Sequence, residues 1–413
     1  MARTKKRSKV KISVEVILVL LLILVIAAVA CYFLVPEFKK RADDYLQQVF
    51  GNKETPSNLA KGEHDLRVHY LDVGQGDCIF IEFPDDTVML IDSGDRKNAT
   101  AEYIVEYLEK LEVEIIDYLM LTHSDEDHVG NMVQILEAFE VESAYVPDID
   151  EGVITTNAYR NFITALNAET YTTESGASAE CEINKSEMGD LIESENESDV
   201  FFMAFLSPSP RGMYEDGEYD ELNSKKPSTD SVAKNAVSPI TYLEYMGKRL
   251  LFTGDVTGEP TERVMERYET GVYRNLFAKK TGGYYSVSFE EGIDVYKAAH
   301  HGSRLEECNS TEFLQFVNPQ YAICSVGAGN RFGHPHGELL VDLAEMGIPF
   351  YRTDENGTIV VTISPSAGTT IYLTRQDETV TDSAESAAVA EGAAYLVSRR
   401  KIMVNCVSET RIA

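Results

Sequence analysis

Six of the eight histidines in this chain of 413 residues fall in three tight clusters. The clusters are His123 with His128, His300 with His301, and His334 with His336. The first cluster also contains Asp125 and Asp127, and it directly follows the apolar run IIDYLML (115–121). Imidazole and carboxylate groups are the ligands of divalent transition metals, so this spacing predicts a metal site at the carboxyl end of a buried strand. A solvated acidic turn would explain one histidine and some of the acids, but not the whole cluster.

The first cluster provides ligands for two metal ions. His123 and Asp125 alternate along the chain and can face one ion, whereas Asp127 and His128 can face a second. Two adjacent cations lower the pKa of a water molecule between them and stabilise both the attacking and the leaving oxygen of a substrate. Such a centre hydrolyses phosphodiesters, esters or lactams without a protein nucleophile. Asp127 can also accept the proton of the attacking water, which makes it the predicted catalytic base.

The elements that must position these residues form a strand-rich domain that begins near residue 65. Its first half is predicted to contain strands at 66–73, 77–83, 87–92 and 115–121, with helices at 99–111 and 129–139. The second half repeats this pattern, with strands at 200–205, 238–246, 249–254, 294–299, 320–326 and 357–363 and helices at 259–269, 311–317 and 337–346. Two β-rich halves with outer helices predict an α/β fold in which two sheets form a sandwich. The polar segments 148–199 and 211–231 are interpreted as insertions or loops beside the site.

A basic flank followed by a long apolar run predicts a membrane anchor. Residues 1–11 carry six basic side chains and no acid, and residues 16–35 are apolar without interruption. A run of this length can cross a bilayer core of about 30 Å as a helix. The positive flank predicts a cytoplasmic N-terminus and a catalytic domain outside the cell. A cleaved signal peptide is the alternative, but its apolar region normally spans only about 7–15 residues. A lipoprotein signal that ends at Cys31 is a weaker alternative.

The predicted organisation has five parts. They are a cytoplasmic flank (1–11), a transmembrane anchor (12–35), a juxtamembrane helix and linker (36–64), the catalytic domain (65–365) and an acidic, alanine-rich tail (366–413). The formal net charge of -31 would repel a polyanion, which excludes general packaging of nucleic acid and a stable nucleic-acid partner. An encounter between a metal centre and one phosphodiester stays open. The six cysteines show no CxxC spacing, which argues against a cysteine-type zinc site.

Seven segments, in order along the chain, resemble the metallo-β-lactamase superfamily and, within it, the hydrolase-like C-terminal domain of the ComEC family of DNA-uptake channels. They are HYLDVGQGDC (69–78), LIDSG (90–94), LTHSDEDHVGN (121–131), LLFTGDV (250–256), AAHHGS (298–303), CSVGAGNRFGHPHGE (324–338) and YRTDENGTI (351–359). The resemblance extends over about residues 65–363. It implies an αββα four-layer sandwich and a metal-dependent hydrolase with two divalent ions, zinc or manganese, at its site. It also implies a role in competence and DNA uptake.

The resemblance further implies roles for individual residues. The metal ligands would be His123 and Asp125 for the first ion, Asp127, His128 and either His300 or His301 for the second, and Asp255 of FTGD as a bridge. Asp125 stands where the superfamily has a second histidine. The superfamily's intermediate histidine has no counterpart, and the segment KNAVS (234–238) occupies that region. The first site therefore lacks a nitrogen ligand, which leaves open a single weak site, a water-filled position or a preference for manganese.

Four further residues are expected around the metal ligands. Asp77 and Asp92 lie at strand ends, where short carboxylates fix ligands by hydrogen bonds, although a turn-capping role is an equal alternative for Asp77. His336 is predicted to orient or protonate a substrate oxyanion and His334 to support it, with a structural proline turn as the alternative.

SVAK (231–234) and KTG (280–282) match two motifs of serine penicillin-recognising enzymes. No SDN element lies between them, so no serine site is assigned.

These features predict a membrane-anchored, extracytoplasmic, metal-dependent hydrolase of a bacterium, with phosphodiesterase or nuclease activity on DNA or nucleotides. The hydrolase prediction rests on the ligand set, and the prediction of DNA as substrate rests on the resemblance alone. Two alternatives remain. The same site can act on a cell-wall phosphodiester, a lactone or a β-lactam, or the protein can be an inactive binding component of a surface complex.

Overall fold

The structure is a computed structural model that describes residues 61–194, 199–214, 217–376 and 378–381. The predicted flank and anchor, and most of the juxtamembrane segment and of the tail, lie outside the described residues. Within the described ranges, no helix is both long enough and apolar enough to cross a membrane.

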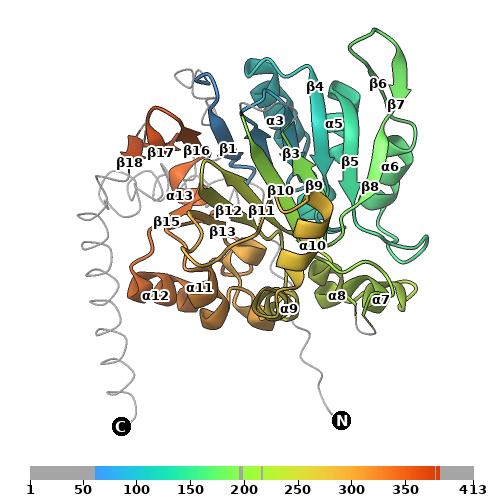
Figure 1. Cartoon of the computed structure of the whole chain (residues 1–413). Helices are drawn as coiled ribbons and strands as arrows, with labels where there is room; N and C mark the ends of the chain where they lie inside the picture. Colours follow the sequence, from blue (N-terminus) through green and yellow to red (C-terminus); the bar gives the residue numbers. More distant parts are fainter. Residues whose placement is uncertain (1–60, 195–198, 215–216, 377, 382–413) are drawn as a thin grey trace, which may run out of the picture. The chain divides into compact units, whose positions relative to one another are not determined.

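Two large sheets organise the described residues (Figure 1). The nine-stranded sheet has the order β18-β17-β16-β1-β2-β3-β4-β5-β8, and the seven-stranded sheet has the order β15-β14-β13-β12-β11-β10-β9. The strands of the first sheet are β1 (Leu66–Tyr70), β2 (Ile79–Glu82), β3 (Val88–Ile91), β4 (Ile115–Met120), β5 (Glu140–Val146), β8 (Glu182–Lys185), β16 (Ile359–Ser364), β17 (Gly368–Leu373) and β18 (Glu378–Thr381). Those of the second are β9 (Leu191–Glu193), β10 (Phe201–Ser207), β11 (Ile240–Tyr245), β12 (Lys248–Phe252), β13 (Val295–Lys297), β14 (Tyr321–Cys324) and β15 (Phe350–Arg352). A separate hairpin pairs β6 (Thr170–Thr172) with β7 (Ser178–Glu180).

Helices connect the strands and cover the outer faces of the sheets. In the first half of the domain they are α3 (Asn98–Lys110), α4 (Glu126–Val129), α5 (Met132–Ala138) and α6 (Asn157–Leu166). In the second half they are α7 (Glu218–Asn223), α8 (Ser231–Ala236), α9 (Gly258–Glu269), α10 (Val272–Thr281), α11 (Thr311–Val317), α12 (Gly337–Met346) and α13 (Thr353–Asn356). Two 3-10 turns, η1 (Ala299–Gly302) and η2 (Leu305–Glu307), follow β13.

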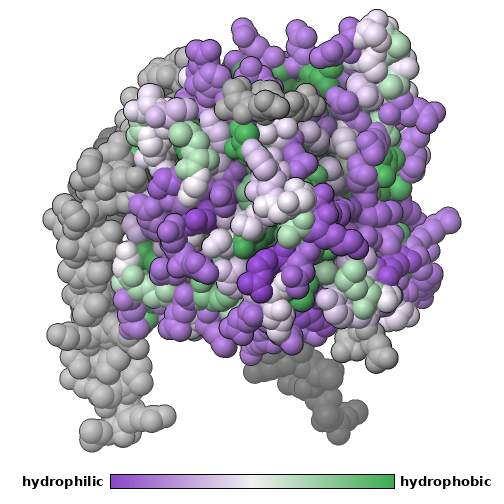
Figure 2. Space-filling model, in the orientation of Figure 1, coloured by the Kyte–Doolittle hydropathy of each residue, from purple (hydrophilic) through white to green (hydrophobic). Residues whose placement is uncertain are grey.

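Three buried apolar clusters define four layers. Alternate side chains of a strand point to opposite faces of its sheet. In β2, Ile79 and Ile81 belong to the cluster between the two sheets, whereas Phe80 belongs to the cluster under α3, α5 and α6. In β12, Leu250 lies between the sheets and Leu251 packs in the cluster under α9 to α12. The predicted α/β sandwich of two sheets between helical layers is therefore confirmed. The face of the molecule seen in Figure 2 is largely hydrophilic.

The structure differs from the sequence prediction in several segments, among them β5 (Glu140–Val146), a strand that the sequence did not predict. The polar segment 148–199 contains α6 and four short strands, of which β8 pairs parallel to β5 and extends the nine-stranded sheet. The segment 211–231, predicted as a loop, contains α7. The sheet continues past the predicted domain boundary at residue 365, because β17 pairs with β16 and β18 pairs with β17. Ile371 and Leu373 of β17 bury their side chains between the sheets.

Candidate metal centre

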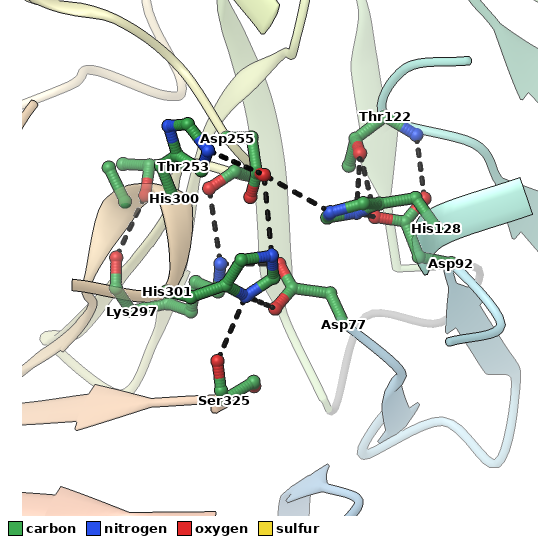
Figure 3. Close-up of polar contacts among 12 residues, drawn as sticks. Asp77, Asp92, Thr122, His128, Thr253, Asp255, Lys297, His300, His301 and Ser325 are labelled. Carbon is green, nitrogen blue, oxygen red and sulfur yellow. Dashed lines mark hydrogen bonds and ion pairs between the residues drawn. The ribbon is translucent and has the colours of Figure 1, made fainter. Parts of the chain in front are cut away.

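The predicted ligands meet because their loops leave parallel strands in the same direction. β3 and β4 run parallel, as do β12, β13 and β14, and loops at the carboxyl ends of parallel strands gather at one edge of a sheet. Asp92 follows β3, the segment 121–128 follows β4, Asp255 follows β12 and His301 follows β13. β2 runs antiparallel to β3, which brings Asp77, just before β2, to the same edge. Figure 3 shows side chains from these loops gathered around Asp255.

His128 is fixed through its Nδ1 atom. The ring is fully buried, and Nδ1 lies 2.7 Å from Oδ2 of Asp92. Asp92 also accepts hydrogen bonds from the backbone N–H of Thr122 at 2.8 Å and from its hydroxyl at 2.6 Å. A carboxylate only accepts, so in the neutral ring Nδ1 carries the proton and Nε2 keeps its lone pair. The side chain predicted to fix a ligand, Asp92, thus lies directly behind one.

His301 is oriented in the same way, by a carbonyl group. Its Nδ1 donates to O of Ser325 at 2.9 Å, which leaves the lone pair on Nε2. The backbone has positive φ at both His300 (47°) and His301 (52°), and only the second ring turns inward. Nε2 of His300 lies 3.7 Å from Asp255, and its side chain is 27% exposed and lines a cavity. The geometry therefore favours His301 as the ligand and leaves His300 on the cavity wall.

Four side chains bring ligand atoms close to one another. Oδ2 of Asp255 lies 3.3 Å from Nε2 of His128 and 3.3 Å from Nε2 of His301. Oδ2 of Asp127 lies 3.4 Å from the same atom of His301. Ligand atoms about 2.1 Å from a tetrahedral ion are about 3.4 Å apart. Both Nε2 atoms are buried without a hydrogen-bond partner among the described residues. Asp127, His128 and His301 form one candidate ligand group, and Asp255 lies against both imidazoles, so the four side chains together offer ligands for a divalent cation.

The protonation states of the four side chains depend on one another. Burial lowers the pKa of His128 and of His301, but Asp255 and the neighbouring carboxylates outweigh burial and raise both values well above their usual range. Burial raises the pKa of Asp255 and of Asp127, but the imidazoles outweigh it and lower both values. A cation that binds here takes the place of the imidazole protons and keeps both carboxylates ionised.

The two ligands predicted for the first ion, His123 and Asp125, differ in what they contact. His123 is buried, with Nδ1 3.1 Å from the hydroxyl of Thr122 and with Nε2 lacking a hydrogen-bond partner among the described residues. It forms a candidate ligand group with His128 and Asp255. Burial and the neighbouring His128 lower the pKa of His123 to about 4, so its lone pair is available at neutral pH. Asp125 belongs to none of the ligand groups found in the described ranges. Its Oδ1 instead forms an ion pair with Nζ of Lys234.

Asp77 lies next to His301 and pairs with Lys297, a residue that the sequence analysis did not single out. Both side chains are buried, and Nζ of Lys297 also donates to O of Gly254 at 3.1 Å. Oδ1 of Asp77 lies 3.4 Å from Nδ1 of His301. The pair therefore ties the end of β13 to the loop before β2, beside the imidazole that it supports. The signal for it was a lysine within the apolar run 294–299, directly before the two histidines.

A cavity of about 800 Å³ opens beside the four ligands. Its lining includes Asp127, Asp255 and His300, the acids Asp95, Asp125 and Glu126, and the loop residues Asn330, Arg331, Phe332 and His334. Asn330 holds this loop in place: its side-chain amide donates to O of Gly327 and of His334, and its Oδ1 accepts the N–H groups of Phe332 and His334. The loop therefore presents its side chains to the cavity from a fixed backbone.

His334, rather than His336, reaches the cavity. The buried Nδ1 of His334 has no hydrogen-bond partner in the described part of the chain. Burial and the nearby histidines lower the pKa of His334 to about 4, so the ring is neutral at pH 7. Nδ1 of His336 accepts the N–H of Arg304 at 2.9 Å, and the N–H of His336 donates to O of Gly302. His336 thus holds the segment after His301 against the start of α12.

Asp92→Asn is expected to lower metal affinity by about 10–100-fold. The single acceptor oxygen of an amide cannot serve both Nδ1 of His128 and the two donors of Thr122, so His128 loses its fixed tautomer. Asp92 has a φ of 59°, which asparagine also adopts, so the backbone should persist. Competition with a metal-binding dye measures the affinity. Asp86→Asn, at an exposed position with a φ of 72°, is the matched control, and equal affinities of the two variants would exclude this role of Asp92.

Comparison with known proteins identifies relatives of the chain. Residues 71–164 match the family model of the metallo-beta-lactamase superfamily. The chain is 26% identical over 329 residues to ComE operon protein 3 of Bacillus subtilis (strain 168), which covers 76% of this chain and 34% of that protein. It is 27% identical over 113 residues to competence protein ComA of Neisseria gonorrhoeae, which covers 27% of this chain and 13% of that protein. The chain therefore spans about a third or less of the length of these relatives.

Solved structures give weaker similarity. The metallo-beta-lactamase fold protein YhfI from Bacillus subtilis has a TM-score of 0.36 at 9% identity, over 69% of this chain and 95% of that one. Zn(2+)-bound PqqB from Methylobacterium extorquens has a TM-score of 0.37 at 10% identity, over 70% of this chain and 87% of that one. The family match over residues 71–164 and the similarity to ComE operon protein 3 confirm the resemblance to the metallo-β-lactamase superfamily that the seven segments predicted.

Proposed function

We propose that the domain is a metal-dependent phosphodiesterase or nuclease. The observation that carries the proposal is the convergence of Asp127, His128, Asp255 and His301 on one point beside an open cavity. We also propose that the run 16–35 anchors the protein in a bacterial cell membrane with the domain outside the cell. Accessibility of the domain to a protease added to intact cells tests this topology.

The residues around the cavity have different roles in the proposed reaction. A zinc or manganese ion in the four-ligand site supplies Lewis-acid activation of water and stabilisation of negative charge. Asp127 lines the cavity and stays ionised, so its carboxylate can accept the proton of the attacking water. His334 is neutral and lies on the cavity wall, where it can donate a hydrogen bond to a substrate oxygen. His334 therefore takes the substrate-contacting role that the sequence had assigned to His336.

Two features support a nucleotide-containing phosphodiester as the substrate. One relative is named a competence protein, and the sequence resembles DNA-uptake channels, which together favour DNA as the molecule encountered. Phe332 lines the cavity but is 49% exposed, and Arg331 lies with its guanidinium carbon 4.8 Å from the centre of the Phe332 ring. An exposed aromatic ring next to a cation can stack on a base and bind the adjacent phosphate.

Phe332→Ala is expected to raise KM for a single-stranded oligonucleotide by about 5–150-fold, because stacking of one base contributes about 1–3 kcal/mol. We expect a smaller change in kcat, which would arise through His334, because its ring stacks on Phe332 with 5.6 Å between the ring centres. Steady-state kinetics with an oligonucleotide and with methyl p-nitrophenyl phosphate, which has no base, separate the two effects. Tyr284→Ala removes an aromatic ring that is 70% exposed and is the control. A KM that is unchanged for both substrates would refute a stacking role for Phe332.

The proposed function is tested with the full chain purified in detergent. Cleavage of bis-p-nitrophenyl phosphate, single-stranded DNA and a chromogenic cephalosporin is measured in zinc or manganese and then after chelation. We expect cleavage of the two phosphodiesters, lost on chelation and restored by metal. Cleavage of the cephalosporin alone would instead support the lactam alternative, and no turnover with any substrate would support a binding role.

A further inference from the structure

Lys234 occupies the side of the centre where a first metal ion is expected. Its Nζ forms an ion pair with Oδ1 of Asp125, and the two side chains are 17% and 29% exposed. Asp125 is the residue that stands in place of the superfamily's second histidine. The carboxylate predicted to bind the first ion is therefore already neutralised by an ammonium group of the same chain.

The fold holds Lys234 in this position. Asp230 is the N-cap of α8 (Ser231–Ala236), and its Oδ1 accepts the N–H groups of Val232 at 3.1 Å and Ala233 at 3.2 Å. Ala233 and Asn235, on either side of Lys234, are buried. A capped helix with buried neighbours fixes the point from which the lysine side chain extends. Ser231 and Asn235 of the same helix line the cavity, as does Asp125, so Lys234 pairs with a carboxylate of the cavity wall.

The remaining ligands are too few for a first ion. His123 offers Nε2, but the other members of its ligand group, His128 and Asp255, already belong to the four-ligand site. Ser238 Oγ lies 3.4 Å from Nδ1 of His123 and accepts the N–H of Asp255 at 3.3 Å, so it faces the opposite ring nitrogen. A first ion would have His123 as its only unshared ligand, and it would lie close to a fixed positive charge.

We infer that the centre binds one divalent ion, and that the ammonium group of Lys234 takes the place of the other ion of a two-metal site. The inference rests on the proposed four-ligand metal site. In a two-metal centre both ions carry positive charge that stabilises substrate oxygens. Here Lys234 supplies a single fixed charge on the same side, which partly compensates the acids of the cavity lining. This arrangement accounts for the absence of the intermediate histidine from the sequence, since no first ion needs it.

The number of bound ions tests the inference without reference to activity. The full chain in detergent is saturated with manganese, freed of unbound ion, and analysed for metal by mass spectrometry and by electron paramagnetic resonance. We expect one ion per chain with the spectrum of an isolated Mn²⁺. Lys234→Ala should bind a second ion, because Asp125 becomes available beside His123 and Asp255, and its spectrum should show coupling between two ions. Lys234→Gln repeats the loss of charge with a side chain of similar length.

Two controls complete the experiment. Lys234→Arg keeps the positive charge and should still bind one ion, and Lys226→Ala removes an exposed lysine that pairs with Asp150 and should also bind one. Two coupled ions in the unmodified chain would overturn the inference. The same holds if Lys234→Ala and Lys234→Gln both fold, by circular dichroism, and still bind one ion. Failure of the unmodified chain to bind any manganese or zinc would instead refute the four-ligand site and with it the proposed function.

Discussion

Asp255→Asn is expected to remove the bound ion and to lower kcat/KM for phosphodiester cleavage by at least about 10³-fold. Asp255 contacts both imidazoles of the four-ligand site, each at 3.3 Å. The substitution removes its negative charge and places an amide N–H₂ group where a ligand oxygen should be. A divalent ion stabilises the transition state by several kcal/mol, and a loss of about 4 kcal/mol corresponds to about 10³-fold at 1.36 kcal/mol per tenfold.

Kinetics and metal content must be measured on the same preparation of Asp255→Asn. The matched control is Asp86→Asn, the same change in an exposed carboxylate whose partner is Lys61. This control should keep both the metal and the activity. If Asp255→Asn retained full activity with its metal, the four-ligand site would not be the site of hydrolysis. Loss of activity with the metal retained would show that Asp255 acts on the substrate and is not needed to hold the ion.

The sequence predicted most of the elements whose apolar pattern reaches the core, although it missed β5, in which Val141, Ala144 and Val146 are buried. The run 115–121 became β4 (Ile115–Met120), and the helix predicted at 337–346 is α12 (Gly337–Met346). Periodicity failed where burial is slight: β6, β7 and most of β8 are exposed or half-exposed, so they carry little apolar signal. β17 was missed for a related reason, since its buried positions include Thr369 as well as Ile371 and Leu373.

The candidate site was predicted where the spacing was local and missed where partners are far apart in the chain. His123, Asp127 and His128 lie on one turn, so their proximity followed from the sequence. The choice between His300 and His301 required the backbone, because two adjacent residues with positive φ direct their rings differently. The partners Lys234 and Asp125 are 109 residues apart, and only the packing of the two halves brings them together.

The second large effect is expected on the stability of the domain, when the buried ion pair of Lys297 and Asp77 is broken. Their side chains are 0% and 1% exposed. Burial raises the pKa of Asp77, but the Lys297 ammonium and the His301 imidazole outweigh it and lower the pKa below its usual range. Asp77 is therefore ionised in the folded protein and depends on Lys297 for compensation. A buried charge left without its partner is costly, because the interior solvates it poorly.

Lys297→Met is therefore expected to destabilise the domain by about 3–5 kcal/mol and to lower Tm by roughly 10 °C. Thermal unfolding with a chelator present excludes a contribution from bound metal. Because the pKa of Asp77 is lowered on folding, the pair stabilises the protein above the pKa of an unfolded aspartate, about 3.9, and the difference between the two proteins should shrink as the pH falls below it.

A matched pair in the same sheet provides the control for Lys297→Met. Lys248 pairs with Asp294 at 2.7 Å, but its side chain is 31% exposed, so Lys248→Met should cost at most about 1 kcal/mol. Adding Asp77→Leu to Lys297→Met removes the orphaned carboxylate and should recover most of the lost stability, since an apolar pair can replace a buried ion pair. Equal losses from Lys297→Met and Lys248→Met, with no recovery in the double variant, would mean that burial of the pair contributes nothing. A large loss of stability in Lys297→Met and its recovery in the double variant would show that Lys297 serves to keep Asp77 ionised beside His301.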